Sequence, residues 1–406
     1  MSDVKIDIYS PDVYSDGPPH DAFAELRRRD PVSWQEVPGE PGYWAVLRHA
    51  DLVEVAKHPL IYSAETGGVI IENPPPETLE SSRRMLLMMD PPTHTHYRRP
   101  VAPRFRANVI GALEEEVRAI VTEILDEAAD RREVEFVQDV AAKLPSRVFG
   151  RVMGLPEADL PHLHHLAEML TSSQDPDFQY DGPENAAPNG ASIEMAMYAI
   201  ELAHTRRAMA DPPDDLATMV LNTEFNGALM DDFGFGSFFV QIVTAGNDTT
   251  KTMLTAGLLS LLQHPDQLAA LRSDPSGWPV AVEEILRYDN PLHYFRRTAM
   301  VDTVLNGKQI AAGDKVVMVY TSANRDETVF DRPQQFDSRR HPNPHLSFGI
   351  AEHFCLGAHL ARLEARVFFE ELMLRFRDFE VTGPPVRIRS NLNNAYSRAP
   401  MRLIPA

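Results

Sequence analysis

The sequence contains one cysteine, Cys355, among 406 residues. A single thiol cannot form a disulfide within the chain, so packing and hydrogen bonding have to hold the fold together. Hydrophobic residues make up 43% of the sequence, which is ample for a large buried core. A cysteine that is not needed as a cross-link is either a small buried apolar side chain or a functional thiol.

Basic residues are also scarce, because 39 Lys and Arg stand against 59 Asp and Glu, a net charge of −20. Such an acidic chain is not expected to bind nucleic acid or anionic membranes in general. Residues 1–10 lack the apolar core of a signal peptide or membrane anchor. The most apolar long stretch, residues 238–262, contains Asp248 and Lys251 and predicts a buried helix. We therefore expect a soluble, cytoplasmic protein without a membrane anchor.

No internal repeat, low-complexity tract or dinucleotide-binding fingerprint occurs in the sequence. Gly234-Phe-Gly236 has neither a preceding strand nor the third glycine that such a fingerprint needs. Because no segment is typical of flavin or nicotinamide binding, electrons for any redox reaction would have to come from another protein.

Helical patterns dominate the chain. Apolar residues recur at helical spacing over residues 108–130, and residues 231–264 predict one helix about 50 Å long. Residues 42–55 predict a strand followed by a short helix, and Asn306-Gly307 predicts a hairpin turn. Short strands are expected again over residues 381–406. Together these patterns predict a single mostly α-helical domain over residues 1–406, with small antiparallel β-sheets near its ends.

Cys355 lies in the string Phe348-Gly-Ile-Ala-Glu-His-Phe-Cys-Leu-Gly357, and a helical pattern begins at Ala358. The unpaired N–H groups and positive dipole end of a helix N-terminus favour a thiolate. Nearby glycines let the backbone approach the sulfur or a flat ligand closely. Position alone would still favour an inert buried thiol, since that is the more frequent environment of a free cysteine.

The whole string resembles the haem-binding loop of the cytochrome P450 family, Phe-Gly-x-Gly-x-His-x-Cys-x-Gly, and the resemblance runs from about Phe23 to Leu403. It implies the cytochrome P450 fold, with haem b (iron protoporphyrin IX) as cofactor. It also implies that Cys355 is the thiolate ligand of the iron and that Phe348 and Gly357 contact the haem. Ala351 stands where the family pattern has its second glycine. Because alanine at a positive φ costs about 1 kcal/mol, we expect this turn to differ slightly.

A second motif, Thr244-Ala-Gly-Asn-Asp-Thr-Thr250, lies inside the predicted long helix. Glycine and paired threonines weaken a helix there, and alone they are as often a tolerated irregularity as a functional one. The motif resembles the oxygen-binding segment of the family. The resemblance implies that Ala245 and Gly246 lie against the distal haem face, and that Asp248 and Thr249 are catalytic, relaying the protons that O₂ activation needs.

Two further pairs are expected to meet on helix faces. Glu284 and Arg287 are three residues apart. An ordinary exposed ion pair on a helix has the same spacing, so the pair alone does not indicate a buried network. By resemblance they form a structural lock with a second arginine, best matched by Arg340.

His94 and Arg98 are four residues apart in a helix expected after two prolines, where surface capping is the common alternative. The family resemblance implies that they bind the haem propionates together with Arg297 and His353. Burying two carboxylates in an apolar slot requires such cationic or hydrogen-bonding partners.

The resemblance also implies partners. A ferredoxin with its reductase would supply NAD(P)H-derived electrons, and a cluster of arginines is expected to form a basic island for it. These residues are Arg98, Arg99, Arg104, Arg106, Arg362 and Arg366, of which Arg98 should turn inward.

The resemblance places substrate contacts in several segments, among them residues 67–89, the mobile-looking segment 171–191 and residues 391–396. These segments are largely apolar and predict an uncharged ligand. The leading hypothesis is a haem-thiolate monooxygenase that activates O₂ and hydroxylates a terpenoid, steroid or lipid-like molecule. Desaturation, coupling or peroxygenase chemistry on the same fold is an alternative, although the Asp248-Thr249 pair argues against peroxide dependence. A haem-binding sensor or carrier without enzymatic activity is the remaining alternative.

Overall fold

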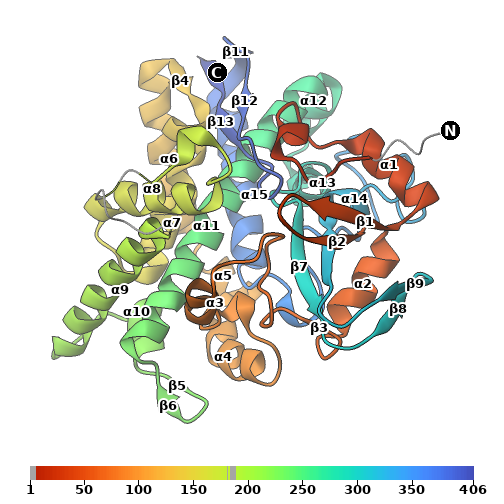
Figure 1. Cartoon of the computed structure of the whole chain (residues 1–406). Coiled ribbons are helices and arrows are strands. Elements are labelled where there is room, and N and C mark those ends of the chain that lie inside the picture. The colour runs from red at the N-terminus through yellow and green to blue at the C-terminus, as the bar shows by residue number, and fades with distance from the viewer. Residues whose placement is uncertain (1–5, 181, 183–188) are drawn as a thin grey trace.

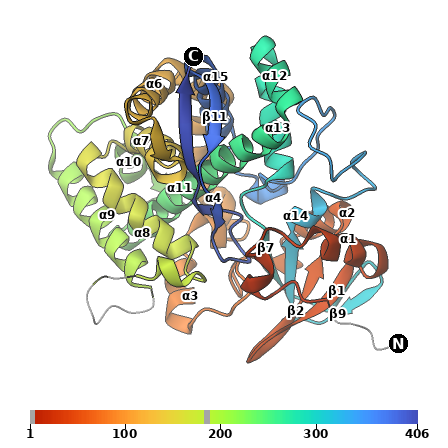
Figure 2. The same ribbon diagram turned by 90° about the horizontal axis from the view of Figure 1, so that it is seen from above.

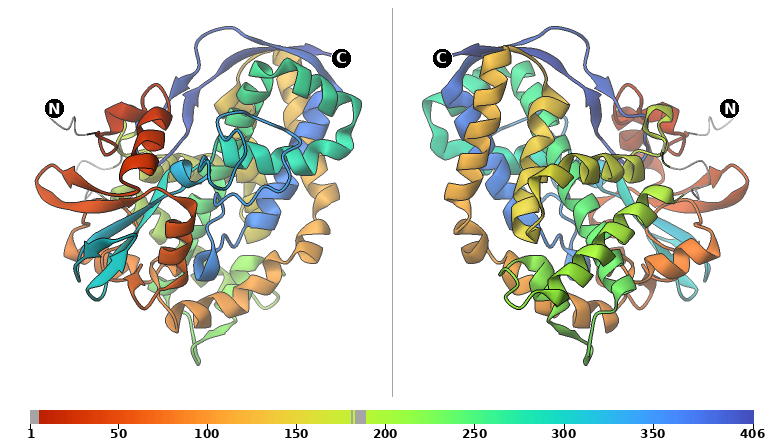
Figure 3. Two further views of the ribbon diagram at one scale, coloured as in Figure 1. Left: turned by 90° about the vertical axis from the view of Figure 1, so that its right-hand side faces the viewer. Right: turned by 90° about the vertical axis from the view of Figure 1, so that its left-hand side faces the viewer.

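The computed structural model describes residues 6–180, 182 and 189–406. Long helices gather on one side of the molecule, and the largest sheet lies on the other with the N-terminal helices (Figures 1 and 2). The mostly helical architecture with small sheets, predicted from the sequence, is confirmed. The strands and helices nearest the N-terminus face away from α6 and α7, as both views in Figure 3 show.

The α-helices are α1 (His20–Arg29), α2 (His49–Lys57), α3 (Pro76–Ser82), α4 (Thr93–Val101), α5 (Ala107–Gly111), α6 (Glu114–Arg131), α7 (Lys143–Met153), α8 (Leu160–Thr171), α9 (Gly190–Ala208), α10 (Leu216–Leu221), α11 (Asp232–Gln263), α12 (Pro265–Ser273), α13 (Trp278–Tyr288), α14 (Tyr320–Ala323) and α15 (Ala358–Arg375).

The strands are β1 (Val32–Val37), β2 (Glu40–Val46), β3 (Tyr62–Ser63), β4 (Glu133–Glu135), β5 (Glu224–Phe225), β6 (Ala228–Leu229), β7 (Tyr294–Ala299), β8 (Thr303–Leu305), β9 (Lys308–Ile310), β10 (Lys315–Val319), β11 (Phe376–Val381), β12 (Val386–Arg387), β13 (Tyr396–Arg398) and β14 (Pro400–Pro405).

The central helix α11 spans 32 residues and confirms the long helix expected over residues 231–264. It begins where the Asp231 carboxylate accepts a hydrogen bond of 2.6 Å from the Gly234 N–H, an N-cap that satisfies a free backbone donor. Helices α7, α8, α9, α13 and α15 all contact it, so most of its length is buried. The largest hydrophobic core lies around this helix.

The prediction of one continuous helix over residues 108–130 is wrong in one respect, because the structure divides this segment into α5 and α6. The break follows Gly111, whose flexible backbone lowers helix stability. Helix α6 then packs along α15, the helix that follows Cys355.

The largest sheet has the strand order β1-β2-β10-β7-β3 and carries hydrophobic clusters on its two faces. One pairing differs from the expected antiparallel arrangement, since β10 runs parallel to β2. These two strands are joined by most of the chain, so no hairpin restricts their direction. The hairpin predicted at Asn306-Gly307 is confirmed between β8 and β9, with φ of +49° and +77° at the two turn residues.

The strands expected over residues 381–406 are also present. There β14 pairs with β11 and with β4, and β12 pairs with β13. Residues 66–89 form a long irregular segment that contains the short helix α3. Of the segment 171–191, for which mobility was expected, residues 181 and 183–188 lie outside the described residues.

Within the described part of the chain, no helix combines the length and the apolar composition that crossing a bilayer requires.

Candidate functional site

A buried carboxylate, Glu284 in α13, organises the region before the cysteine loop. The Arg287 guanidinium donates to both of its oxygens, at 2.7 and 2.8 Å, and neither side chain is exposed. Arg340 donates from its Nε at 3.0 and 3.2 Å, which confirms this arginine as the predicted third member. The Asn343 amide and the Asp337 N–H add bonds of 3.1 and 2.8 Å. Such a network is stable inside a protein because every charged group is satisfied.

The two arginines extend this network to the backbone. Arg287 donates to the carbonyl oxygens of Asn324, Pro333 and Gln335, and Arg340 donates to those of Asp331, Arg332 and Gln335. One buried carboxylate therefore ties α13 to the irregular chain of residues 324–343, which leads into the cysteine loop.

The cysteine loop itself is fastened at several points. The Asn324 side chain accepts from the Leu346 N–H at 2.7 Å, and the Ser347 hydroxyl donates to the Leu286 carbonyl at 2.6 Å. The Cys355 N–H donates to the Phe348 carbonyl at 2.7 Å, which closes the loop on itself. Ala351 adopts φ of +59°, so alanine occupies the left-handed conformation expected of the family's glycine.

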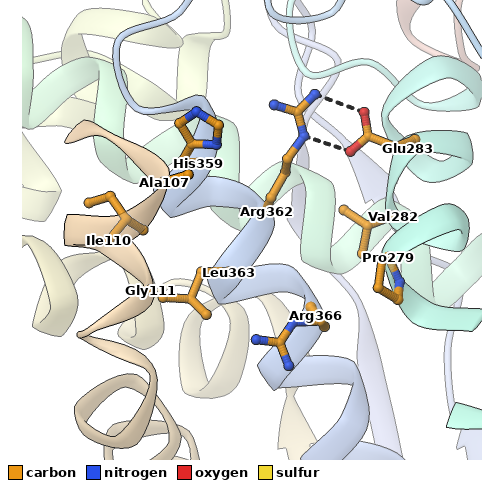
Figure 4. Close-up of a pocket in the computed structure, with 10 residues that line it drawn as sticks. All are labelled: Ala107, Ile110, Gly111, Pro279, Val282, Glu283, His359, Arg362, Leu363 and Arg366. Atoms are coloured by element: carbon orange, nitrogen blue, oxygen red, sulfur yellow. Dashed lines mark hydrogen bonds and ion pairs between the residues drawn. The ribbon is translucent and has the colours of Figure 1, made fainter. Parts of the chain in front are cut away.

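Glu283, next to the buried carboxylate, reaches the other side of the loop. It binds the Arg362 guanidinium of α15 at 2.6 and 2.8 Å (Figure 4). It also lies 3.0 Å from the His345 ring nitrogen Nε2. Arg362 also lies over the Phe348 ring, with 4.4 Å between its guanidinium carbon and the ring centroid. These contacts lie beside a surface pocket of 270 Å³ between α5, α13 and α15. The loop is thus held from both sides by adjacent residues of α13.

Cys355 sits just before α15 and is accessible to water, yet protein atoms crowd around it. Burial raises the pKa of its thiol, while the Gly357 N–H and the Arg98 and Arg362 guanidinium groups lower that pKa. A thiol with this balance keeps its proton at neutral pH, and a bound metal ion would remove it. Cys355 therefore has the chemistry of a metal ligand held within a preformed loop.

Four cationic or imidazole side chains gather beside this loop from three parts of the chain. The rings of His94 in α4 and His353 lie 4.3 Å apart, and Arg98 donates to the Phe354 carbonyl at 2.5 Å. Arg297 in β7 is buried and donates to the Arg296 carbonyl at 2.8 Å. Burial, reinforced by Arg98 and Arg297, lowers the pKa of His94 to about 4. The structure thus brings together all four residues that the sequence assigned to propionate binding.

This cationic cluster fits the two carboxylates of haem b. Both ring nitrogens of His94 and Nε2 of His353 are buried without a partner among the described residues. The acid that acts on His94 and Arg297 is Asp90, whose carboxylate already accepts from the Ser63 hydroxyl and from the Ala64 N–H at 2.9 Å. Buried donors with spare capacity favour an anionic ligand.

The centre of α11 carries the second predicted motif. Ala245 is exposed near the middle of this largely buried helix, and Gly246 is half-buried. The Thr249 hydroxyl donates to the Ala245 carbonyl at 2.8 Å, one turn earlier. Asp248, in contrast, is 4% exposed and accepts a hydrogen bond from the Thr171 hydroxyl in α8. Ala245 and Thr249 thus share a face of α11 that is open, while the acid between them points into the protein.

Sequence reasoning missed the partners of Asp248. Lys251, 1% exposed, places its ammonium 2.9 Å from Asp248 Oδ1 and 2.6 Å from Glu168 Oε1 of α8. A lysine within the most apolar stretch of the chain was the available signal, because a buried ammonium needs a carboxylate.

The expected basic island is largely wrong. Arg362 is paired with Glu283, Arg366 with Glu114 and Glu370, and Arg104 with Asp214. These acids come from distant segments, so a count of nearby arginines did not include them. Arg98 turns inward as expected, and Arg99 and Arg106 are exposed.

Apolar residues of the segment 67–89 were expected to contact substrate. Val69 and Met88 pack with Ala64 in a small buried cluster, and Phe295 of β7 lies against it. This segment therefore has a hydrophobic interior of its own next to α4.

Adjacent residues of α13 provide a test of the network. Glu284→Gln removes the negative charge that Arg287 and Arg340 share and should lower the free energy of unfolding by about 3–5 kcal/mol. Glu283→Gln is the matched control, since this side chain is 26% exposed and its loss should cost about 1 kcal/mol. Urea titration of both variants measures the difference, with haem content as a second readout. Equal losses would contradict the central role of Glu284.

Comparison with known proteins gives a consistent result. A family model described as cytochrome P450 matches residues 279–394. The chain is 35% identical to a linalool 8-monooxygenase of Pseudomonas putida over 98% of this chain and 99% of that protein. It is 35% identical to a steroid C26-monooxygenase of Rhodococcus jostii, over 96% of this chain and 82% of that protein.

Among solved structures, a Mycobacterium marinum cytochrome P450 in complex with pseudoionone superposes with a TM-score of 0.90. The two sequences are 37% identical, and the match covers 98% of each chain. Together with the cysteine loop and the cationic cluster, these similarities show that the chain belongs to the cytochrome P450 family and is a monooxygenase that uses haem b.

Proposed function

We propose that this enzyme takes electrons from a ferredoxin, activates O₂ and hydroxylates an uncharged hydrophobic small molecule of terpenoid, steroid or lipid-like type. The observation that carries the proposal is the arrangement of Cys355 at the start of α15 and of the open face with Ala245 and Thr249 on α11, the helix against which α15 packs. Two of the relatives are named for linalool and for steroids, which supports a hydrophobic substrate class.

In this proposal Cys355 is the proximal ligand of the haem iron. His94, Arg98, Arg297 and His353 would bind the propionates. The charges of the two arginines would offset the two carboxylates, and the two imidazoles would add hydrogen bonds. When bound, the haem supplies the iron centre for O₂ reduction and C–H hydroxylation. Phe348 and Gly357 complete the proximal wall, where the backbone N–H of Gly357 stabilises negative charge on the sulfur.

Ala245 and Gly246 form the opposite wall in this proposal. The small side chain of Ala245 is exposed and leaves room beside α11. Gly246 lies toward the Phe149 ring of α7, because a Cβ added there would make ordinary van der Waals contact with that ring at 3.7 Å. Thr249, on the same face as Ala245, orients water with its hydroxyl, and Asp248 supplies protons from its buried position. Proton delivery by a positioned acid and hydroxyl favours hydroxylation because it removes one oxygen atom of O₂ as water.

Thr249→Ala tests this assignment. Haem content and substrate affinity should be unchanged, because the side chain binds neither, whereas the fraction of electrons recovered in product should fall about tenfold. The lost electrons should appear as hydrogen peroxide. Thr250→Ser, at the neighbouring buried threonine, is a control that keeps a hydroxyl and should retain wild-type coupling. Normal coupling in Thr249→Ala would remove Thr249 from the mechanism.

The substrate class is tested by optical titration of the haem with matched ligands. A long-chain alcohol should bind at least about tenfold more tightly than the fatty acid of equal length, because an apolar lining disfavours an unpaired carboxylate. Terpenoid alcohols and steroids should also shift the spectrum. Equal affinity for the acid and the alcohol would contradict an uncharged substrate.

The electron donor is proposed to dock near Arg99 and Arg106, the exposed arginines of α4 and of the turn before α5 that form no ion pair within the described residues. Charge reversal of both should slow reduction by a ferredoxin about threefold or more at low salt, and the difference should shrink as salt is added. Arg29→Glu in α1, where Arg29 is 77% exposed, is the control. Stopped-flow reduction rates that match wild type at every salt concentration would exclude this surface.

A further inference from the structure

A second surface pocket, of 380 Å³, opens between α7, α8 and the π-helical turn Val137–Ala141. Its lining includes Gln138, Lys143, His164 and Glu168. Glu168 is only 6% exposed although it contributes to the pocket wall. Its carboxylate therefore lies at the inner end of the pocket, between solvent and the core.

A short chain of charged groups leads from this wall to the acid of α11. Glu168 Oε1 lies 2.6 Å from Lys251 Nζ, and the same ammonium lies 2.9 Å from Asp248 Oδ1. Lys251 thus contacts a carboxylate at the pocket and the carboxylate next to Thr249. Helix α8 also holds the far oxygen of Asp248, through the Thr171 hydroxyl one turn after Glu168.

The pocket end of the chain has further polar contacts. Gln138 donates to Glu168 Oε1 at 2.9 Å, and His164 Nε2 lies 3.4 Å from the same oxygen. The other cations that line the pocket are directed elsewhere, since Lys143 and Arg147 bind Glu127 at 2.7 and 3.2 Å. His164 is therefore the titratable neighbour of Glu168 on the pocket side.

The pKa shifts of Glu168 and Lys251 indicate the charges that these two groups carry. Burial raises the pKa of Glu168, but His164 and Lys251 outweigh it and the pKa ends well below its usual value. For Lys251 burial lowers the pKa, and the carboxylates of Asp248 and Glu168 reverse this so that the pKa is raised. Lys251 therefore carries its proton at rest between two acceptors.

We propose that this pocket is the solvent entrance for the protons that reach Asp248, and that Glu168 and Lys251 are positioning residues that connect Asp248 to it. The inference rests on the proposed role of Asp248 and Thr249 and extends it to bulk solvent. In each transfer the Lys251 ammonium passes one proton to Asp248, and Asp248 passes a proton on to the water that Thr249 orients. Lys251 regains a proton through Glu168 from a hydronium ion at the pocket, so Asp248, Lys251 and Glu168 all return to their starting charges.

The first test needs no turnover. Lys251→Met leaves two buried carboxylates without their shared cation, so one of them should take up a proton. Infrared difference spectra of the holoenzyme at neutral pH, variant minus wild type, should show the carbonyl band of a protonated carboxylic acid. Subtraction removes the signal of Glu364, a buried acid whose pKa burial raises to about 8 and which neither variant alters. Lys251→Arg and the pocket control Lys143→Met should lack the new band, and its absence from Lys251→Met would overturn the linkage.

The second test measures proton delivery. In Glu168→Gln the fraction of electrons recovered in product should fall about tenfold, and the solvent deuterium isotope effect on turnover should rise. Glu168→Asp should recover part of the loss, which loss of packing alone would not explain. Lys143→Met should behave as wild type, because Lys143 lines the same pocket without contacting Glu168.

The outcomes separate this inference from the proposed function. Uncoupling in Thr249→Ala together with wild-type coupling and isotope effect in Glu168→Gln would overturn the solvent entrance and leave the proton role of Asp248 and Thr249 standing. Wild-type coupling in Thr249→Ala would overturn the proposed function itself. If Lys251→Met does not retain haem, Glu168→Gln decides, since it keeps the contact between Lys251 and Asp248.

Discussion

The chain that leads into the cysteine loop depends on the buried carboxylate of Glu284. It is the common acceptor for Arg287, Arg340 and Asn343, and the arginines in turn bind carbonyl groups over residues 324–335. The irregular chain before the cysteine has few regular backbone hydrogen bonds, so these side chains take their place. The neighbouring Glu283 reaches α15, and the cysteine loop lies between the two contacts.

Buried charge is used in three different ways in this structure. Around Glu284 it is balanced within the protein and stabilises the loop. In the cluster of His94, Arg98, Arg297 and His353, the two arginines carry more charge than the nearby acid Asp90 offsets, and such an excess suits an anionic ligand. In the set Glu168, Lys251 and Asp248 the balance leaves one net negative charge, and a proton is the smallest ion that can offset it.

The parts of the site that could be predicted from the sequence lie in short motifs. Cys355, the Glu284–Arg287 pair and the Asp248-Thr249 pair each lie within a few residues, so local spacing determines their geometry. The ion pairs of Arg362 and Arg366 and the parallel pairing of β2 with β10 join segments far apart in the chain. Their partners are chosen by tertiary packing, which composition and periodicity do not encode. Lys251 is an intermediate case. Its burial could be predicted from the apolar stretch around it, but its ion pair with Glu168 could not.

Ala351, with φ of +59°, shows that the loop conformation is imposed by its anchors and not by the residue that occupies the turn. A glycine at position 351 would avoid the steric conflict that the alanine Cβ creates at this positive φ. The hydrogen bonds and ion pairs around the loop nevertheless make alanine tolerable there. Recognition of such loops by a strict consensus would therefore reject functional chains like this one. A search that includes the anchors Glu284, Arg287 and Arg340 together with the cysteine would recognise this chain.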